Sequence, residues 1–222
     1  MACSILLVGP GDATFCPECF SMIRFVAPPM CPCCGIPMAG AGVDHLCGNC
    51  LVSRPPFAIA RAVARYEAVL LDAIHVFKYK GKITTGEVLG KIMADHIYPD
   101  FSIADYSLIV PVPLHAKRLR ERGFNQAVIL AREISKRFSI RLDFLTLRRH
   151  VFTEPQVSLG KDQRTANVRG AFVVKDGKKI QGQKIILVDD VYTTGSTVKE
   201  CAGALMAHGA AEVAVLTLAR AV

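Results

Sequence analysis

Two adjacent carboxylates and a hydroxyl-rich turn are the residues of this chain best suited to chemistry. Asp189 and Asp190 end an apolar run that begins at Ile185, and they are followed by Thr193, Thr194, Gly195, Ser196 and Thr197. At a helix N-terminus, the backbone N–H groups and hydroxyls of such a turn suit a phosphate monoester. The carboxylates would accept hydrogen bonds from sugar hydroxyls or help to hold a ligand-bound magnesium ion. A ribose 5-phosphate carrying a magnesium-bound pyrophosphate has all three features.

Cysteines form a second group with chemical potential. Eight of the nine lie before residue 51, in a segment with three C-x-x-C pairs. In a cytosolic protein this spacing predicts metal ligands rather than disulfides. We expect one structural zinc site, since four thiolates leave no open coordination position. The predicted ligands are Cys31, Cys34, Cys47 and Cys50, whose two pairs are separated by twelve residues as in a zinc ribbon.

The remaining cysteines of this segment leave alternatives open. Cys16 and Cys19 could join Cys3 in a second, incomplete metal site, or they could compete with another pair for the single zinc ion. Cys33 is predicted to be a bystander.

Positive charge is concentrated between residues 115 and 149, with ten lysines and arginines against three acids, or +7 of the chain's net +8. Arg118, Arg120 and Arg122 are predicted to crowd a loop, where guanidinium groups would suit a pyrophosphate. Lys78 and Arg164 are weaker candidates for that role. The stretch could be an ordinary solvated helix face, but its local charge favours polyphosphate or nucleic acid. With 7% aromatic residues and no Trp, we expect salt-sensitive phosphate contacts rather than strong base stacking.

A parallel sheet must position these residues. The apolar run from 185, an amphipathic stretch over 198–208 and a second apolar run over 213–218 predict a strand–loop–helix–strand unit with its loop at the ligand-binding edge. Residues 148–170 have little pattern and are expected to form a functional loop or lid. Further strands are expected at 62–66, 107–112, 141–147 and 170–174, and further helices at 68–79, 83–97 and 124–138.

The length of 222 residues suits one sizeable α/β domain with a small appendage. We expect a Cys-rich zinc-ribbon module over residues 1–54 and the α/β domain over 55–222, joined at the proline-rich linker 53–56. No run reaches the roughly 20 apolar residues of a membrane span. The first ten residues lack the basic start and cleavage site of a signal peptide, so we expect a cytoplasmic protein.

Residues 185–197 resemble the PRPP-binding signature of type I phosphoribosyltransferases, and the surrounding motifs narrow the resemblance. They occur in the order found in the ComF family (ComFC, or GntX-like) and cover essentially the whole chain. These motifs are Cys31-x-x-Cys-Gly35, Cys47-Gly-x-Cys50, Pro111-Val-Pro-Leu114, Arg122-Gly-Phe-Asn-Gln126, Thr153-x-Pro-Gln156, Arg164-x-x-Asn-Val168, Gly170-Ala-Phe172 and Val188-Asp-Asp-Val-x-Thr-Thr-Gly195.

The resemblance implies a type I phosphoribosyltransferase-like parallel sheet flanked by helices, with an N-terminal zinc ribbon. It implies that Asp189 and Asp190 meet the ribose hydroxyls of PRPP and that residues 193–197 hold its 5-phosphate. The family is associated with natural transformation and imported single-stranded DNA, which makes that DNA and other DNA-uptake proteins candidate partners. One departure is that the first cysteine pair of longer members is reduced here to Cys3.

Two functions are compatible with these features. The first is an enzyme that transfers phosphoribosyl from magnesium-bound PRPP to an unknown acceptor. The second is a non-catalytic module that senses PRPP or a nucleotide while its zinc ribbon and basic stretch bind single-stranded DNA. Only Phe152 and Tyr192 suggest themselves as contacts for a nucleobase, so the sequence does not identify an acceptor.

Overall fold

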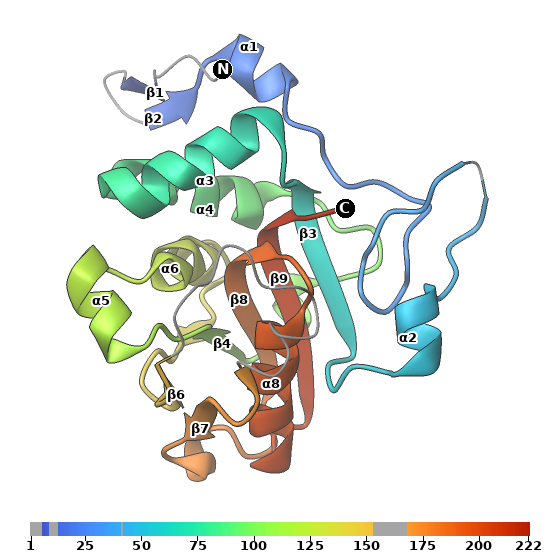
Figure 1. The fold of residues 1–222 in the computed structure, drawn as a ribbon, viewed down its shortest axis with the longest axis vertical. Coiled ribbons are helices and arrows are strands. Elements are labelled where there is room, and N and C mark those ends of the chain that lie inside the picture. The colour runs from blue at the N-terminus through green and yellow to red at the C-terminus, as the bar shows by residue number, and fades with distance from the viewer. Residues whose placement is uncertain (1–5, 9–12, 41, 153–167) are drawn as a thin grey trace.

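A five-stranded parallel sheet forms the centre of the computed structural model, which describes residues 6–8, 13–40, 42–152 and 168–222 (Figure 1). Its strand order is β3-β9-β8-β4-β5, so the strand carrying the two carboxylates lies in the middle. The strands are β3 (Ile59–Arg65), β4 (Leu108–Pro111), β5 (Arg141–Leu142), β8 (Lys184–Tyr192) and β9 (Glu212–Arg220). Two antiparallel hairpins lie outside it: β1 (Leu6–Val8) with β2 (Ala13–Phe15), and β6 (Leu147–Arg149) with β7 (Phe172–Val174).

Both faces of the central strands are covered. Ile186 and Val188 pack on one side with the helices α3 (Ala68–Lys80), α4 (Ile83–Asp95) and α6 (Gln126–Phe138). Ile185 and Leu187 pack on the other side with α8 (Ser196–Ala207) and the cysteine-rich segment. This double burial explains why the apolar run of β8 is continuous rather than alternating. The helices are α1 (Pro17–Ser21), α2 (Gly48–Val52), α3 (Ala68–Lys80), α4 (Ile83–Asp95), α5 (Ala116–Arg122), α6 (Gln126–Phe138) and α8 (Ser196–Ala207), with short 3₁₀ turns η1 (Ile103–Asp105) and η2 (Gly177–Lys179).

The cysteine-rich segment packs directly against the edge strand β3. The Ala60 N–H donates to the Cys33 carbonyl at 2.8 Å, and buried Arg61 donates to the Pro32 carbonyl at 3.0 Å. Gly35 has a φ of +71°, and a Cβ there would lie 2.4 Å from the Ala60 carbonyl oxygen. Only glycine allows this approach. The contacts cover the exposed hydrogen-bonding groups of an edge strand; the predicted module boundary at residue 54 stays a prediction.

The α/β fold class predicted from the sequence is confirmed, but two local predictions were wrong. Residues 118–122, which were expected in a loop, form the last turns of α5. The helix begins after His115, which caps it: His115 Nδ1 accepts a hydrogen bond from the Lys117 N–H at 3.2 Å. The strand expected over 141–147 is split into β5 and β6. The Asp143 carboxylate turns the chain by accepting from the N–H groups of residues 145 and 146 at 2.8 and 2.9 Å.

The stretch 148–170 was expected to be a lid, but most of it, residues 153–167, lies outside the described residues. In the described part of the chain no helix is both long and apolar enough to cross a membrane.

Candidate functional site

The two carboxylates lie on β8 itself, because this strand extends as far as Tyr192. Neighbouring residues of a strand face opposite sides of a sheet, so Asp189 and Asp190 diverge. Asp190 points toward α3, and Asp189 points toward α8, where its charge acts on the thiol of Cys201. The pair therefore offers ligand atoms on both sides of the sheet edge.

Lys78 is the ion-pair partner of Asp190. Its Nζ lies 2.8 Å from Asp190 Oδ2, and the two side chains are only 19% and 11% exposed. Burial alone would lower the pKa of Lys78, but the Asp190 charge outweighs burial and raises it. Lys78 was a weak sequence candidate for a pyrophosphate contact, and the structure brings it directly to the carboxylates from the last turn of α3.

Asp189 holds its proton more firmly than an ordinary carboxyl. Burial and the nearby charge of Asp190 raise its pKa to about 7. The Asp190 N–H, which donates to Asp189 Oδ1 at 2.9 Å, and the positive charges of Lys78 and Arg149 oppose this rise. A cation bound beside Asp189 would favour the ionised carboxylate. The site is thus electrostatically suited to a ligand that brings a metal ion.

The hydroxyl-rich turn leads from β8 into α8. Gly195 is the N-cap, has a φ of +78° and offers no capping side chain, and the first N–H of the helix, that of Ser196, donates to Thr194 Oγ1 at 3.4 Å. Thr194 Oγ1 and Ser196 Oγ lie 2.9 Å apart in the turn, with exposed Thr193 before them and half-buried Thr197 after them. Backbone N–H groups and clustered hydroxyls at a helix N-terminus match the requirements of a phosphate.

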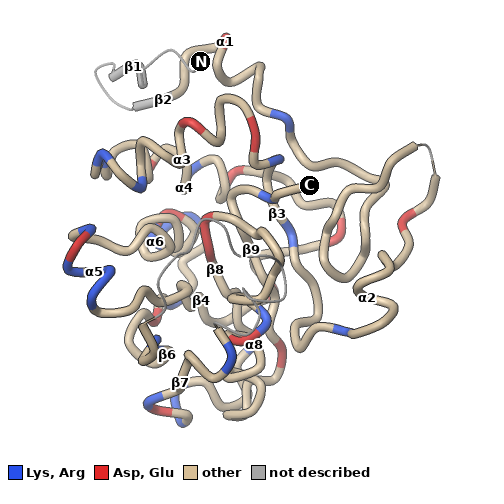
Figure 2. Tube along the Cα trace, viewed as in Figure 1, with Lys and Arg blue, Asp and Glu red and all other residues tan. Residues whose placement is uncertain are grey.

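The three predicted arginines do not converge. Arg118 and Arg122 lie four residues apart on one face of α5, whereas Arg120 points away and is exposed. Arg122 donates to Gln126 Oε1 at 2.7 Å and lies over the Tyr79 ring. Figure 2 shows α5 as a mostly basic helix beside the sheet. Arg164 lies outside the described residues.

Arg149 is a charged residue near the site that the sequence did not single out. Burial and the charge of Arg118 lower its pKa, whereas the charges of Cys201 and Asp189 oppose this effect. Its guanidinium therefore lies within electrostatic reach of a carboxylate at the site. The available sequence signal was its position at the end of the basic stretch, which does not distinguish it from its neighbours.

Four thiols converge in the cysteine-rich segment, as the sequence predicted. The sulfur atoms of Cys31, Cys34, Cys47 and Cys50 all lie within 4.8 Å of one another, and the Cys34–Cys47 separation is 3.7 Å. A tetrahedral site with Zn–S bonds of about 2.3 Å requires sulfurs roughly 3.8 Å apart, so the group fits zinc. Burial would raise the pKa of Cys31, but the N–H groups of Cys34 and Cys47 lower it to about 6, which favours the thiolate.

The other described cysteines near the N-terminus do not belong to the four-thiol group. Cys33 is outside the four-thiol cluster, and burial raises its pKa. Cys16 and Cys19 pack in the hydrophobic cluster on the α3 and α4 side of the sheet, so they do not compete for the four-thiol site. Cys3, their suggested partner, is outside the described residues.

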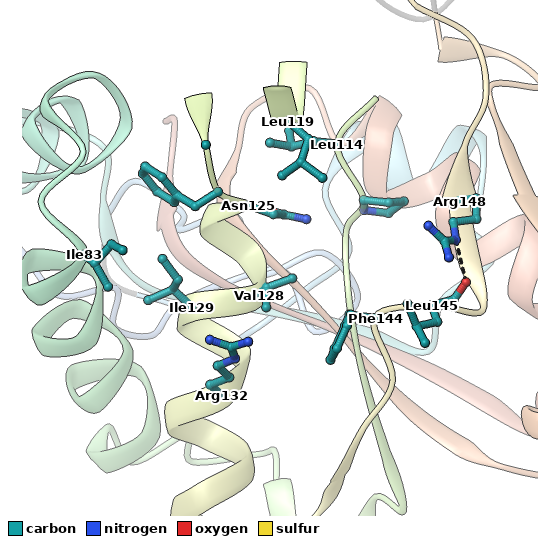
Figure 3. A pocket seen from close by; sticks show the side chains of 13 residues that line it. Ile83, Leu114, Leu119, Asn125, Val128, Ile129, Arg132, Phe144, Leu145 and Arg148 are labelled. Carbon is teal, nitrogen blue, oxygen red and sulfur yellow. Dashed lines mark hydrogen bonds between the residues drawn. The ribbon is translucent and has the colours of Figure 1, made fainter. Parts of the chain in front are cut away.

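An apolar pocket of about 480 Å³ lies beyond β4, between α5, α6 and the segment that follows β5 (Figure 3). Phe144 and Leu145 are exposed beside it, and Leu119 is the contribution of α5, a helix without buried residues. Arg132 and Arg148 also line the pocket, and Arg148 Nε donates to the Leu145 carbonyl at 2.7 Å. The full lining is Ile83, Pro113, Leu114, Leu119, Gly123, Phe124, Asn125, Val128, Ile129, Arg132, Phe144, Leu145 and Arg148.

Comparison with known proteins places this geometry in a family. Residues 125–221 match the phosphoribosyl transferase domain, and residues 1–51 match the double zinc ribbon domain. Competence protein ComFC of Bacillus subtilis is 30% identical over 230 residues, covering 98% of this chain and 88% of its own. The chain belongs to the ComF family.

Two further relatives extend the ComF comparison. DNA utilization protein YhgH of Escherichia coli K12 is 34% identical over 195 residues, covering 86% of this chain and 84% of its own. Competence protein F of Haemophilus influenzae is 32% identical, covering 79% and 78% respectively. This ComF protein therefore carries a phosphoribosyltransferase-family domain, and its relatives bear names from competence and DNA utilization.

Proposed function

We propose that this ComF protein binds PRPP as its magnesium complex and transfers the phosphoribosyl group to an acceptor. One observation carries the proposal: β8 delivers two carboxylates to the carboxyl edge of a parallel sheet, directly before a helix N-terminus rich in hydroxyls. Asp189 and Asp190 would accept hydrogen bonds from the ribose hydroxyls. The turn over residues 193–197 would hold the 5-phosphate.

Lys78 and the two arginines Arg118 and Arg149 supply the positive charge that a leaving pyrophosphate needs. In the reaction, the bond from the anomeric carbon to the pyrophosphate oxygen breaks and a bond to an acceptor nitrogen or oxygen forms. The acceptor gives up a proton, and pyrophosphate leaves with magnesium. Fixed cations near the leaving group stabilise this separation of charge. Lys78 is placed to exchange its contact with Asp190 for one with pyrophosphate.

Transfer is tested by pyrophosphate release. The wild-type protein, incubated with magnesium, PRPP and candidate acceptors, should release pyrophosphate only with the correct acceptor, and Asp189→Ala with Asp190→Ala should abolish the release. Asp176→Asn is the matched control, because Asp176 is an acidic residue in a surface turn and pairs with Lys179 at 3.8 Å. If the protein binds PRPP but releases no pyrophosphate with any acceptor, the sensing function is favoured instead.

A specific observation also favours binding of single-stranded nucleic acid. Phe144 is 46% exposed at the apolar pocket, with Arg132 and Arg148 close by (Figure 3). An exposed aromatic ring next to guanidinium groups suits an unstacked base with flanking phosphates. We place the single-stranded DNA contact at this pocket and on the adjacent basic helix α5.

The DNA proposal is tested by fluorescence anisotropy with labelled oligonucleotides over a salt series. Phe144→Ala should weaken oligonucleotide binding about tenfold, because base stacking on the ring is lost. Arg148→Gln should lower the slope of log affinity against log salt concentration by about one, as expected for the loss of one phosphate contact. Phe20→Ala serves as the control, because Phe20 is exposed to a similar degree, at 44%, but lies on α1 and does not line the pocket. Unchanged affinity in Phe144→Ala would remove the pocket from the account.

The two activities are linked if PRPP is a sensed ligand. In that case Asp189→Ala with Asp190→Ala should change DNA affinity measured with saturating PRPP. Equal DNA affinity with and without the substitutions would show that the two sites are independent. We further propose that the four-thiol site holds structural zinc and that the protein works in the cytoplasm, where such thiols stay reduced.

A further inference from the structure

Arg220, at the end of β9, is a buried guanidinium in contact with the four-thiol cluster. The residue is 5% exposed. Its Nη1 donates to the Cys34 carbonyl at 2.6 Å, and its Nη2 lies 3.7 Å from Cys34 Sγ. Among the described residues no carboxylate pairs with it, and its Nε has no hydrogen-bond partner. A buried charge without an opposite charge is costly, so a negative group must offset it.

The thiolates of the cluster can supply that negative charge. Zinc bound by four thiolates carries a net negative charge, which remains next to the guanidinium of Arg220. Residues of this kind fix the orientation of metal ligands, and their loss commonly lowers metal affinity. Zinc in the cluster would therefore fix the Cys34 carbonyl and sulfur against which the guanidinium is buried.

On its other side, Arg220 lies over the ring of Tyr192. The guanidinium carbon is 4.1 Å from the ring centroid, and the two residues are direct partners in the β8–β9 register. Tyr192 Oη in turn lies under the hydroxyl-rich turn, since a Cβ on Gly195 would fall 2.3 Å from it. The Ala221 N–H donates to the Tyr192 carbonyl at 2.9 Å and holds this strand end in place.

We propose that Arg220 and Tyr192 are positioning residues that couple metal occupancy of the four-thiol cluster to the shape of the turn over residues 193–197. The contacts run without a gap from Cys34 through Arg220 and Tyr192 to Gly195. Loss of the metal releases Cys34 from its fixed position, and with it the carbonyl and sulfur that hold Arg220, which frees the tyrosine ring beneath the turn. The coupling rests on the proposed PRPP function only in identifying what the turn binds.

Thermodynamic linkage makes this coupling reciprocal. If metal in the cluster tightens anion binding at the turn, a bound anion must tighten metal binding by the same factor. PRPP with magnesium should therefore slow the release of zinc to a chelator. Couplings of this kind are commonly about 5- to 150-fold, so a tenfold effect is a reasonable expectation.

The test is hydrogen exchange of the 193–197 amides together with chelator-driven zinc release, on the full chain. In wild-type protein, zinc removal should speed exchange in this turn, and PRPP with magnesium should slow zinc release about tenfold. Arg220→Met should show fast exchange even when zinc is loaded, with zinc affinity lowered about 10- to 100-fold. Tyr192→Leu keeps the groups that form the two contacts between Arg220 and Cys34, so this variant should keep zinc but show the same fast exchange.

Arg61→Met is the control, because Arg61 is also a buried arginine that ties the cysteine-rich segment to the sheet, through the carbonyl of Pro32, and it is paired with Asp100. Among the described residues, no hydrogen bond or ion pair of Arg61 involves Tyr192 or a thiol. Slow exchange of the turn in zinc-loaded Tyr192→Leu, or equal acceleration in Arg61→Met, would overturn the coupling. If wild-type protein binds no PRPP but its turn still responds to zinc through Arg220, the coupling stands and the proposed function fails.

Discussion

Replacing Asp189 by asparagine should stabilise the ligand-free protein. Burial and the charge of Asp190 raise the pKa of this carboxyl from 3.8 to about 7, so the folded state holds a proton that the unfolded chain has already released. As the pH rises from about 4 to 7, the folded state must ionise an unfavourably placed group and stability falls. The amide of the Asp189→Asn variant does not ionise, so the stability of the variant should not fall in this way as the pH rises.

The magnitude follows from the size of the shift. About three units of pKa correspond to roughly 4 kcal/mol, which is an upper limit because Asp189 is partly exposed to water. We expect about 1–2 kcal/mol at pH 8, or a rise in Tm of roughly 2–8 °C for a chain of this length. Near pH 4 the carboxyl is protonated in the folded state and about half protonated in the unfolded chain, so most of the difference should be gone.

Thermal unfolding across pH 4–8 measures this effect, with Asp143→Asn as the control of opposite sign. Burial would raise the pKa of Asp143, but hydrogen bonds from Thr146 and from the N–H groups of residues 145 and 146 lower it, so its stabilisation is present at neutral pH and is lost on acidification. Asp143→Asn should therefore lower Tm at pH 7. An Asp189→Asn variant that is no more stable at pH 8, or is equally stabilised at pH 4, would refute the electrostatic reasoning.

Three further variants test other parts of the site. Gly195→Ala should cost about 1–3 kcal/mol in urea unfolding and abolish PRPP binding, because the new Cβ meets a tyrosine hydroxyl at positive φ. Gly203→Ala, whose Cβ would make only an ordinary contact with Pro56 at 3.9 Å, should do neither. Lys78→Met should cost about 3 kcal/mol by leaving its carboxylate partner buried and unpaired, and the exposed neighbour Lys80→Met should be nearly neutral. Cys33→Ser should leave the zinc content measured by atomic absorption unchanged, unlike a change at any of the four ligands; zinc loss here would contradict the assignment.

The parallel sheet and the order of its central elements could be predicted from the sequence because periodicity records burial. The run over 185–188 is apolar at every position since both faces of β8 are covered, and α6 shows its buried stripe plainly. The predicted ends of individual strands and helices were less accurate. The split between β5 and β6 depends on the side chain of Asp143, which turns the backbone in a way that the apolar pattern does not record.

The candidate site was predictable in its parts but not in its arrangement. The residue types identified the carboxylates, the turn and the four cysteines. They did not reveal that Lys78 pairs with Asp190, because 112 positions of chain separate two residues that the fold brings within 2.8 Å. Arg220 lay outside every recognised motif, and only its burial between Cys34 and Tyr192 distinguishes it.

Isothermal titration of zinc-loaded protein with PRPP, with and without magnesium, tests the central claim most directly. The structure predicts binding at a single class of site that is strengthened by magnesium and abolished by Asp189→Ala with Asp190→Ala. Asp176→Asn should bind as the wild type does. Absence of binding to wild-type protein, or undiminished binding to the double variant, would contradict the assignment of residues 189–197 as the PRPP site.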